Sequence, residues 1–158
     1  ATEWSRMAAQ LSGDPTSETM GKAFHMNQFA DEAWNKHLIS TDTADRLKAC
    51  GHAECVVLDL GYTGLTDEGA EVVASALAKG GFPELRELIL ADNRIGDAGA
   101  KAIAEALEKD GAKNLEILDL NLNEIGDAGA AALAQALQNG GAKNLEQLYL
   151  HHNQIGDV

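Results

Sequence analysis

The chain has 158 residues, of which 45% are apolar and only 4% aromatic, enough for one soluble domain with an aliphatic core. No apolar run approaches the roughly 18 residues that a membrane-spanning helix needs. The formal net charge of -13 argues against binding to nucleic acid or to an anionic membrane, because like charges repel. It favours a solvated acidic surface or a protein partner with a basic patch.

The first part of the chain (1–50) differs from the rest and is predicted to form a helical N-terminal arm and cap. A short apolar stripe formed by Trp4, Met7 and Leu11 predicts a first helix, which either grips another subunit or belongs to the cap. A loop is expected over residues 12–21, followed by a helix over residues 26–38. Residues 41–50 align with a segment further along the chain, with Leu47 matching Leu107, and are expected to be the helix of a degenerate first repeat.

Two cysteines follow, Cys50 and Cys55, with His52 between them. Two thiols do not make the disulfide framework of a small secreted domain, and no signal peptide is visible, so an intracellular location, cytoplasmic or organellar, is expected. A zinc site at this segment would lack a fourth ligand nearby. Buried thiols are therefore favoured over a metal site.

From Gly51 onward the sequence repeats at a constant interval. The predicted repeats span residues 51–80, 81–110, 111–140 and 141–158, the last of them incomplete. In the second repeat, Leu88 and Leu90 have the spacing of a short strand with one buried face, and residues 100–107 follow a helical apolar pattern. An aspartate at each helix start is a predicted N-cap (Asp67, Asp97 and Asp127), and a glycine at each helix end is predicted to be left-handed (Gly80, Gly111 and Gly140).

These rows resemble leucine-rich repeats of the ribonuclease-inhibitor type over about two thirds of the chain. The resemblance implies an α/β solenoid with a curved parallel β-sheet on its concave side and helices on its convex side. It also implies a ladder of side chains that hydrogen-bond backbone groups of the turns, formed by Thr63, Asn93, Asn123 and Asn153. The last repeat stops where a helix should begin and the chain starts at Ala1 instead of Met, so we expect additional chain at both ends, or a last repeat buried against another subunit.

The sequence contains no complete motif for catalysis, cofactor binding or metal binding. A calcium loop beginning at Asp119 lacks its glycine at the sixth position, where Glu124 stands, and His151 and His152 are expected on opposite faces of a strand. The outward strand positions are more informative, because they differ between repeats while the core positions recur. They predict a protein interface with an apolar centre and an acidic rim. Its expected residues are Val57, Asp59, Glu87, Ile89, Ile117, Asp119, Tyr149 and His151.

The sequence thus predicts a non-enzymatic protein-binding module, an adaptor or accessory subunit of a larger assembly, that uses its concave face and, as a second contact, its N-terminal arm. Relatives of this repeat type include nuclease inhibitors and Ran GTPase-activating proteins. Regulation of an enzyme or GTPase is therefore the alternative, and an imported subunit of an organellar complex is a third. No cofactor is expected.

Overall fold

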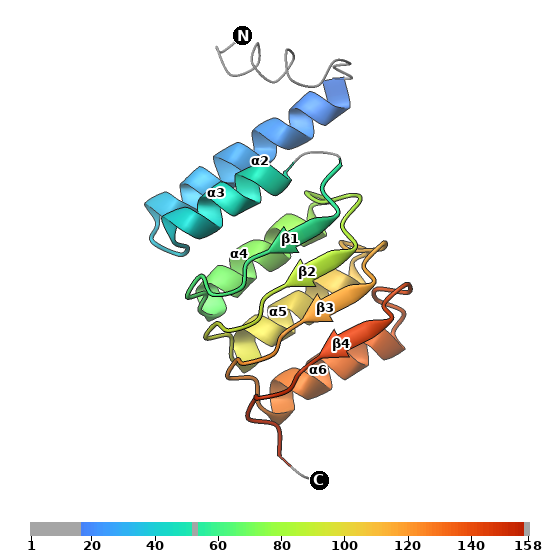
Figure 1. Ribbon diagram of the computed structural model, residues 1–158. Coiled ribbons are helices and arrows are strands. Elements are labelled where there is room, and N and C mark those ends of the chain that lie inside the picture. The colour runs from blue at the N-terminus through green and yellow to red at the C-terminus, as the bar shows by residue number, and fades with distance from the viewer. Residues whose placement is uncertain (1–16, 52–53, 157–158) are drawn as a thin grey trace.

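A computed structural model describes residues 17–51 and 54–156, which form an α/β solenoid in which parallel strands lie on one side and helices on the other (Figure 1). The sheet order is β1-β2-β3-β4, so each repeat stacks directly on the one before it. The elements in chain order are α2 (Ser17–Asn35), α3 (Thr41–Cys50), β1 (Val57–Asp59), α4 (Asp67–Ala78), β2 (Glu87–Ile89), α5 (Asp97–Glu108), β3 (Ile117–Asp119), α6 (Asp127–Gln138) and β4 (Gln147–Tyr149).

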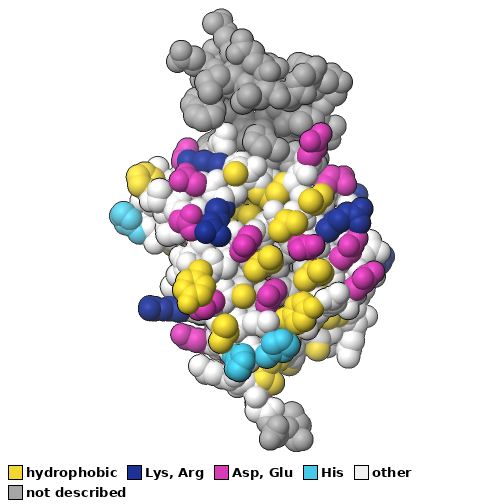
Figure 2. Space-filling model, viewed as in Figure 1, with side chains coloured by type: hydrophobic (Ala, Val, Ile, Leu, Met, Phe, Trp, Pro, Cys, Tyr) yellow, Lys and Arg dark blue, Asp and Glu magenta, His cyan; other side chains and the backbone are white. Residues whose placement is uncertain are grey.

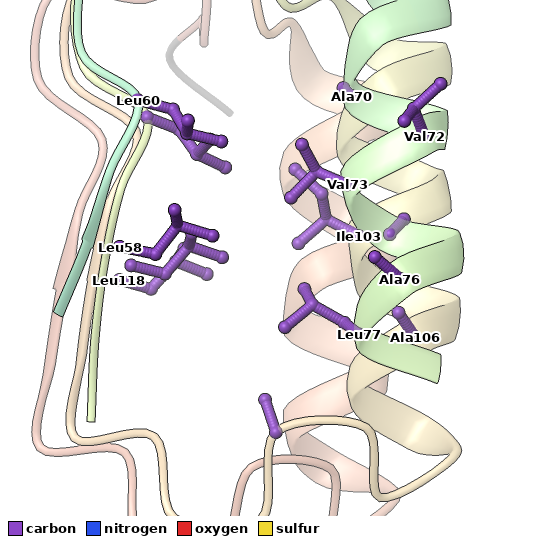
Figure 3. Close-up of a cluster of buried hydrophobic side chains, with 14 of the residues drawn as sticks. Leu58, Leu60, Ala70, Val72, Val73, Ala76, Leu77, Ile103, Ala106 and Leu118 are labelled. Carbon is purple, nitrogen blue, oxygen red and sulfur yellow. The ribbon is translucent and has the colours of Figure 1, made fainter. Parts of the chain in front are cut away.

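The core lies between the sheet and the helices. The middle residue of each of the first three strands points inward, and Leu58, Leu88 and Leu118 are at most 1% exposed. Figure 3 shows the strand leucines facing side chains of the helices, among them Val73 and Ile103. One strand and one helix cannot bury their apolar faces alone, so stacked copies share one continuous core. The predicted solenoid is confirmed.

The fourth repeat is less covered than the others. Leu145, Leu148 and Leu150 are half-buried, whereas their counterparts in the preceding repeat are fully buried. Ile155 is 41% exposed, although its counterpart Ile125 is completely buried. A repeat buries its apolar side chains against both neighbours, and in the structure this one contacts a neighbour on one side.

The N-terminal helices differ in extent from the prediction. Helix α2 begins at Ser17, inside the predicted loop, and no proline interrupts the chain between this residue and the predicted helix start at residue 26. It ends at Asn35, short of the predicted end, and His37 then adopts a left-handed conformation with φ of 57°. Within the predicted helix over residues 26–38, Met26 is buried but Trp34 is 46% exposed, and the Trp34 indole Nε1 donates to the hydroxyl of Thr41.

Helix α3 occupies the segment expected for the degenerate first repeat. The hydroxyl of Ser40 caps its N-terminus by accepting the N–H of Thr43 at 3.1 Å. Helix α2 packs against α3 and also contacts α4. The predicted arm residues Trp4, Met7 and Leu11 lie outside the described residues.

Cys50 and Cys55 form a disulfide, so the prediction of two buried thiols is wrong. Helix α3 ends at Cys50 and the chain turns back toward β1, which brings the two Cα atoms to 5.1 Å, a separation that a disulfide spans. The spacing of the two cysteines in the sequence contained no sign of this turn. The bond closes a short loop between helix α3 and the sheet.

The repeated aspartates do not cap their own helices, in contrast to the prediction. Helix α5 begins at Asp97, and its N-cap residue, Gly96, has no side chain to contribute. The Asp97 carboxylate instead accepts the N–H groups of Gly126 and Gly129, both at 2.8 Å, at the start of the next helix. Asp67 does the same for the first turn of α5. Each aspartate therefore ties one repeat to the next.

The glycines after the helices have two different roles. Gly80 and Gly140 are left-handed as predicted, with φ of 70° and 89°. Gly111 is not, because Asp110 takes that conformation in its repeat with φ of 58°. A Cβ at Gly111 would lie 2.6 Å from the carbonyl oxygen of Leu77, so glycine is needed there for the close approach of the preceding repeat.

An asparagine ladder runs along the turns that follow the strands. Asn93 Nδ2 donates to the carbonyl oxygens of Leu60 and Leu90, and its Oδ1 accepts the N–H of Leu65 at 2.9 Å. Asn123 and Asn153 repeat this pattern one and two repeats later. In the first repeat the Thr63 hydroxyl donates to the oxygen of Leu60, at 2.8 Å. The ladder satisfies backbone groups that the turns leave without backbone partners.

Candidate functional site: the outer face of the sheet

The outer face of the sheet, which corresponds to the predicted concave face, carries the candidate residues in two columns, and we call it the sheet face. Strand pairing in register places equivalent positions of successive repeats side by side. The first column is Val57, Glu87, Ile117 and Gln147, and the second is Asp59, Ile89, Asp119 and Tyr149. All of these strand-face side chains are at least partly exposed.

On the first three strands, apolar and acidic side chains alternate on this face in both directions. Along β1, Val57 is followed by Asp59, whereas along β2 the order is reversed and Glu87 precedes Ile89. Figure 2 shows the resulting pattern of interleaved hydrophobic and acidic side chains. The predicted apolar centre with an acidic rim is therefore wrong, because the register inserts each carboxylate between apolar neighbours.

The turns that follow the strands extend the same pattern. The first residue of each turn has positive φ, between 53° and 63°, and these residues are Tyr62, Asp92, Leu122 and His152. Tyr62 is 83% and Leu122 is 48% exposed, while the repeat between them presents Asp92. These four turn residues were not among the residues predicted to form the interface. Apolar residues in a turn where solvent favours polar ones were the available signal.

Most carboxylates of the sheet face lack a basic partner. Asp59 accepts the N–H of Gly61 at 2.9 Å, and Asp119 accepts that of Asn121 at 3.0 Å. Arg46 approaches the Asp59 carboxylate at 3.9 Å. Among residues 17–51 and 54–156, no salt bridge involves Glu87 or Asp119. The face therefore carries uncompensated negative charge beside exposed apolar groups.

The fourth repeat contributes an aromatic pair, Tyr149 on β4 and His151 after the end of that strand. The ring centroids of Tyr149 and His151 are 5.7 Å apart in an edge-on arrangement, and the Tyr149 hydroxyl donates to the Gln147 side-chain oxygen. The N–H of His151 donates to Asn121 Oδ1 at 2.9 Å. The predicted sheet-face residues thus lie together on one surface, with an aromatic ring at its last repeat.

Metal-binding and membrane-spanning features do not occur in the described part of the chain. There, no group of three or more His, Cys, Asp or Glu side chains is arranged to hold a metal ion. None of the helices in that part has both the length and the apolar character that crossing a bilayer requires.

A hollow of about 460 Å³ between α2 and the end of α4 is lined by Met26, Phe29 and Lys79, with the Lys79 Nζ 4.9 Å from the centre of the Phe29 ring.

Comparison with known families agrees with the repeat architecture. A family model described as Leucine Rich repeat matches residues 56–74, 84–104, 111–134 and 141–158, which is more than half of the chain. The chain belongs to the leucine-rich repeat family. Leucine-rich repeats are generally non-enzymatic modules that bind other proteins. No curated protein matches this leucine-rich repeat chain closely enough to indicate a specific role.

Proposed function

We propose that this leucine-rich repeat protein is a non-enzymatic adaptor or accessory subunit that binds a partner protein through the sheet face. The observation that carries the proposal is the exposure of apolar side chains among carboxylates, with Val57 43% and Tyr62 83% exposed. A solvated face would gain stability from polar residues at these positions, whereas a binding face gains from burying them. The core positions recur in each repeat and the face positions vary, which suits a scaffold that presents a specific surface.

The charge of the face defines the partner's chemistry. Glu87 and Asp119 have no basic partner among the described residues, so a protein with Lys or Arg at its surface would neutralise them. Such pairs would raise the association rate and make it dependent on salt. We also propose that the repeats are of the ribonuclease-inhibitor-like type, supported by the helix of 12 residues in each of α4, α5 and α6.

The test is affinity capture from an extract of the source organism with two charge-matched double variants. Ile89→Glu with Ile117→Glu introduces two carboxylates on the sheet face, and Ala98→Glu with Ala134→Glu introduces two on exposed helix positions. We expect the first variant to lose a partner that the wild type and the second variant retain in fixed stoichiometry. Equal capture by both variants would place the binding site elsewhere, and circular dichroism must show that both variants remain folded.

A further inference from the structure

The sheet face repeats with twice the period of the core. Inward leucines recur in every repeat, but the outward pattern recurs in every second one. Val57 and Ile117 occupy the first column in odd repeats, and Ile89 and Tyr149 occupy the second column in even repeats. The apolar side chains therefore form a zigzag across the four strands, which we call the apolar zigzag.

The dimensions of the apolar zigzag follow from sheet geometry. Neighbouring strands lie about 4.8 Å apart, so the pattern repeats about every 9.6 Å along the stacking direction. The two columns are separated by the distance between residues two apart on a strand, about 6.6 Å. A partner that covers the zigzag must present apolar groups with these two spacings.

An α-helix laid across the strands comes close to the repeat of about 9.6 Å along the stacking direction. Its heptad repeat spans about 10.5 Å, and apolar residues at heptad positions a and d alternate between two sides of the contact line at steps of about 4.5 and 6 Å. An extended segment laid the same way fits poorly, because its side chains on one face recur about every 6.8 Å. Resting on the proposed function, we propose that the sheet face binds an amphipathic α-helix that crosses the four strands, with apolar residues at a and d and basic residues at e and g.

The carboxylates support the same arrangement, because on each of the first three strands the carboxylate occupies the column that the apolar residue does not. Asp59 and Asp119 lie in the second column beside the apolar residues of the first, and Glu87 lies in the first column beside Ile89. On a helix, position g directly precedes a and lies on the side of d, while e directly follows d and lies on the side of a. Basic residues at g would therefore meet Asp59 and Asp119, and a basic residue at e would meet Glu87.

The probe is a fluorescent peptide of three heptads with leucine at a and d and lysine at e and g, whose own dimerisation the lysines oppose. Its control is a peptide of the same composition in which the heptad order is scrambled. Binding is measured by fluorescence anisotropy. We expect the heptad peptide to bind at least about tenfold more tightly than the scrambled peptide, and to weaken as salt is added.

The decisive variant exchanges two side chains on one strand. Glu87→Ile with Ile89→Glu keeps composition and charge but turns the apolar zigzag into a straight stripe through the first three repeats. We expect at least about tenfold weaker binding of the heptad peptide with an unchanged melting temperature. If this exchange unfolds the protein, the equivalent exchange of Ile117 and Asp119 on β3 makes the same test.

The outcomes separate this inference from the proposed function. Equal affinity for the two peptides, or for the wild type and the exchanged variant, would overturn the helical partner. The sheet face would still be the binding site if Ile89→Glu with Ile117→Glu loses the natural partner in the capture experiment. If the exchanged variant still binds the heptad peptide as the wild type does, and Ile89→Glu with Ile117→Glu still captures the natural partner, both proposals are overturned.

Discussion

The asparagine ladder predicts a specific energetic coupling between neighbouring repeats. The carbonyl oxygen of Leu90 accepts from both Asn93 Nδ2, at 3.0 Å, and Asn123 Nδ2, at 2.9 Å. Either asparagine can therefore be replaced while this oxygen keeps one donor. Replacing both by alanine removes both donors at once. Stability should consequently fall by more than the sum of the two single effects.

The magnitude follows from the groups that each change leaves unpaired. Asn123→Ala removes the acceptor of the buried Ile95 N–H, which lies 3.0 Å from Asn123 Oδ1, and should cost about 1–3 kcal/mol. Asn93→Ala removes the acceptor of the N–H groups of Thr63 and Leu65 and should cost at least as much. The double variant additionally leaves the Leu90 oxygen unpaired, so the coupling energy should be about 1–3 kcal/mol.

Urea unfolding followed by circular dichroism measures the free energies of the four proteins in this double-mutant cycle. The matched control is the cycle of Asn93 with Asn153, because Asn153 donates to Leu120 and Leu150 and shares no carbonyl with Asn93. The control pair should be additive within about 0.5 kcal/mol. Additivity in the Asn93–Asn123 cycle as well would refute the shared-carbonyl argument, and an unchanged stability of Asn123→Ala would refute the ladder's structural role.

Two further predictions concern the links between repeats. Asp97→Ala should lower the free energy of unfolding in urea by about 1 kcal/mol, since two N–H groups of the next helix lose their acceptor, whereas Asp97→Asn should cost less because one amide oxygen remains. An unchanged free energy of unfolding in Asp97→Ala would argue against a stabilising role for the Asp97 contact with the next helix. Reduction of the Cys50–Cys55 disulfide should cost about 2 kcal/mol through the short loop it closes, measured as a lower melting temperature. The melting temperature of the Cys50→Ala, Cys55→Ala variant should not change when reductant is added. Detection of two free thiols in the wild-type protein, unfolded without reductant, would contradict the disulfide.

The repeat architecture is specified by the amino-acid pattern alone. The constant interval between repeats places a strand and a helix in each repeat. Leu88 and Leu90 have strand spacing, and the segment after Asp97 follows a helical apolar pattern. Stacking the repeats is the arrangement that buries the apolar face of the strand and that of the helix together. The outward positions followed from the same alternation, since neighbours on a strand point to opposite faces. Local periodicity therefore sufficed for the strands and helices of the repeats and for the strand positions of the sheet face.

How the repeats meet depends on their packing in three dimensions. The apolar zigzag depends on which residue of one strand lies opposite which residue of the next, and the pairing of Glu87 with Ile117 settles it. The Asp97 carboxylate reaches the next helix instead of its own, and Cys50 meets Cys55 because the chain reverses between them. These contacts depend on the path of the turns, and a pattern within one repeat contains no information on the distance to its neighbour.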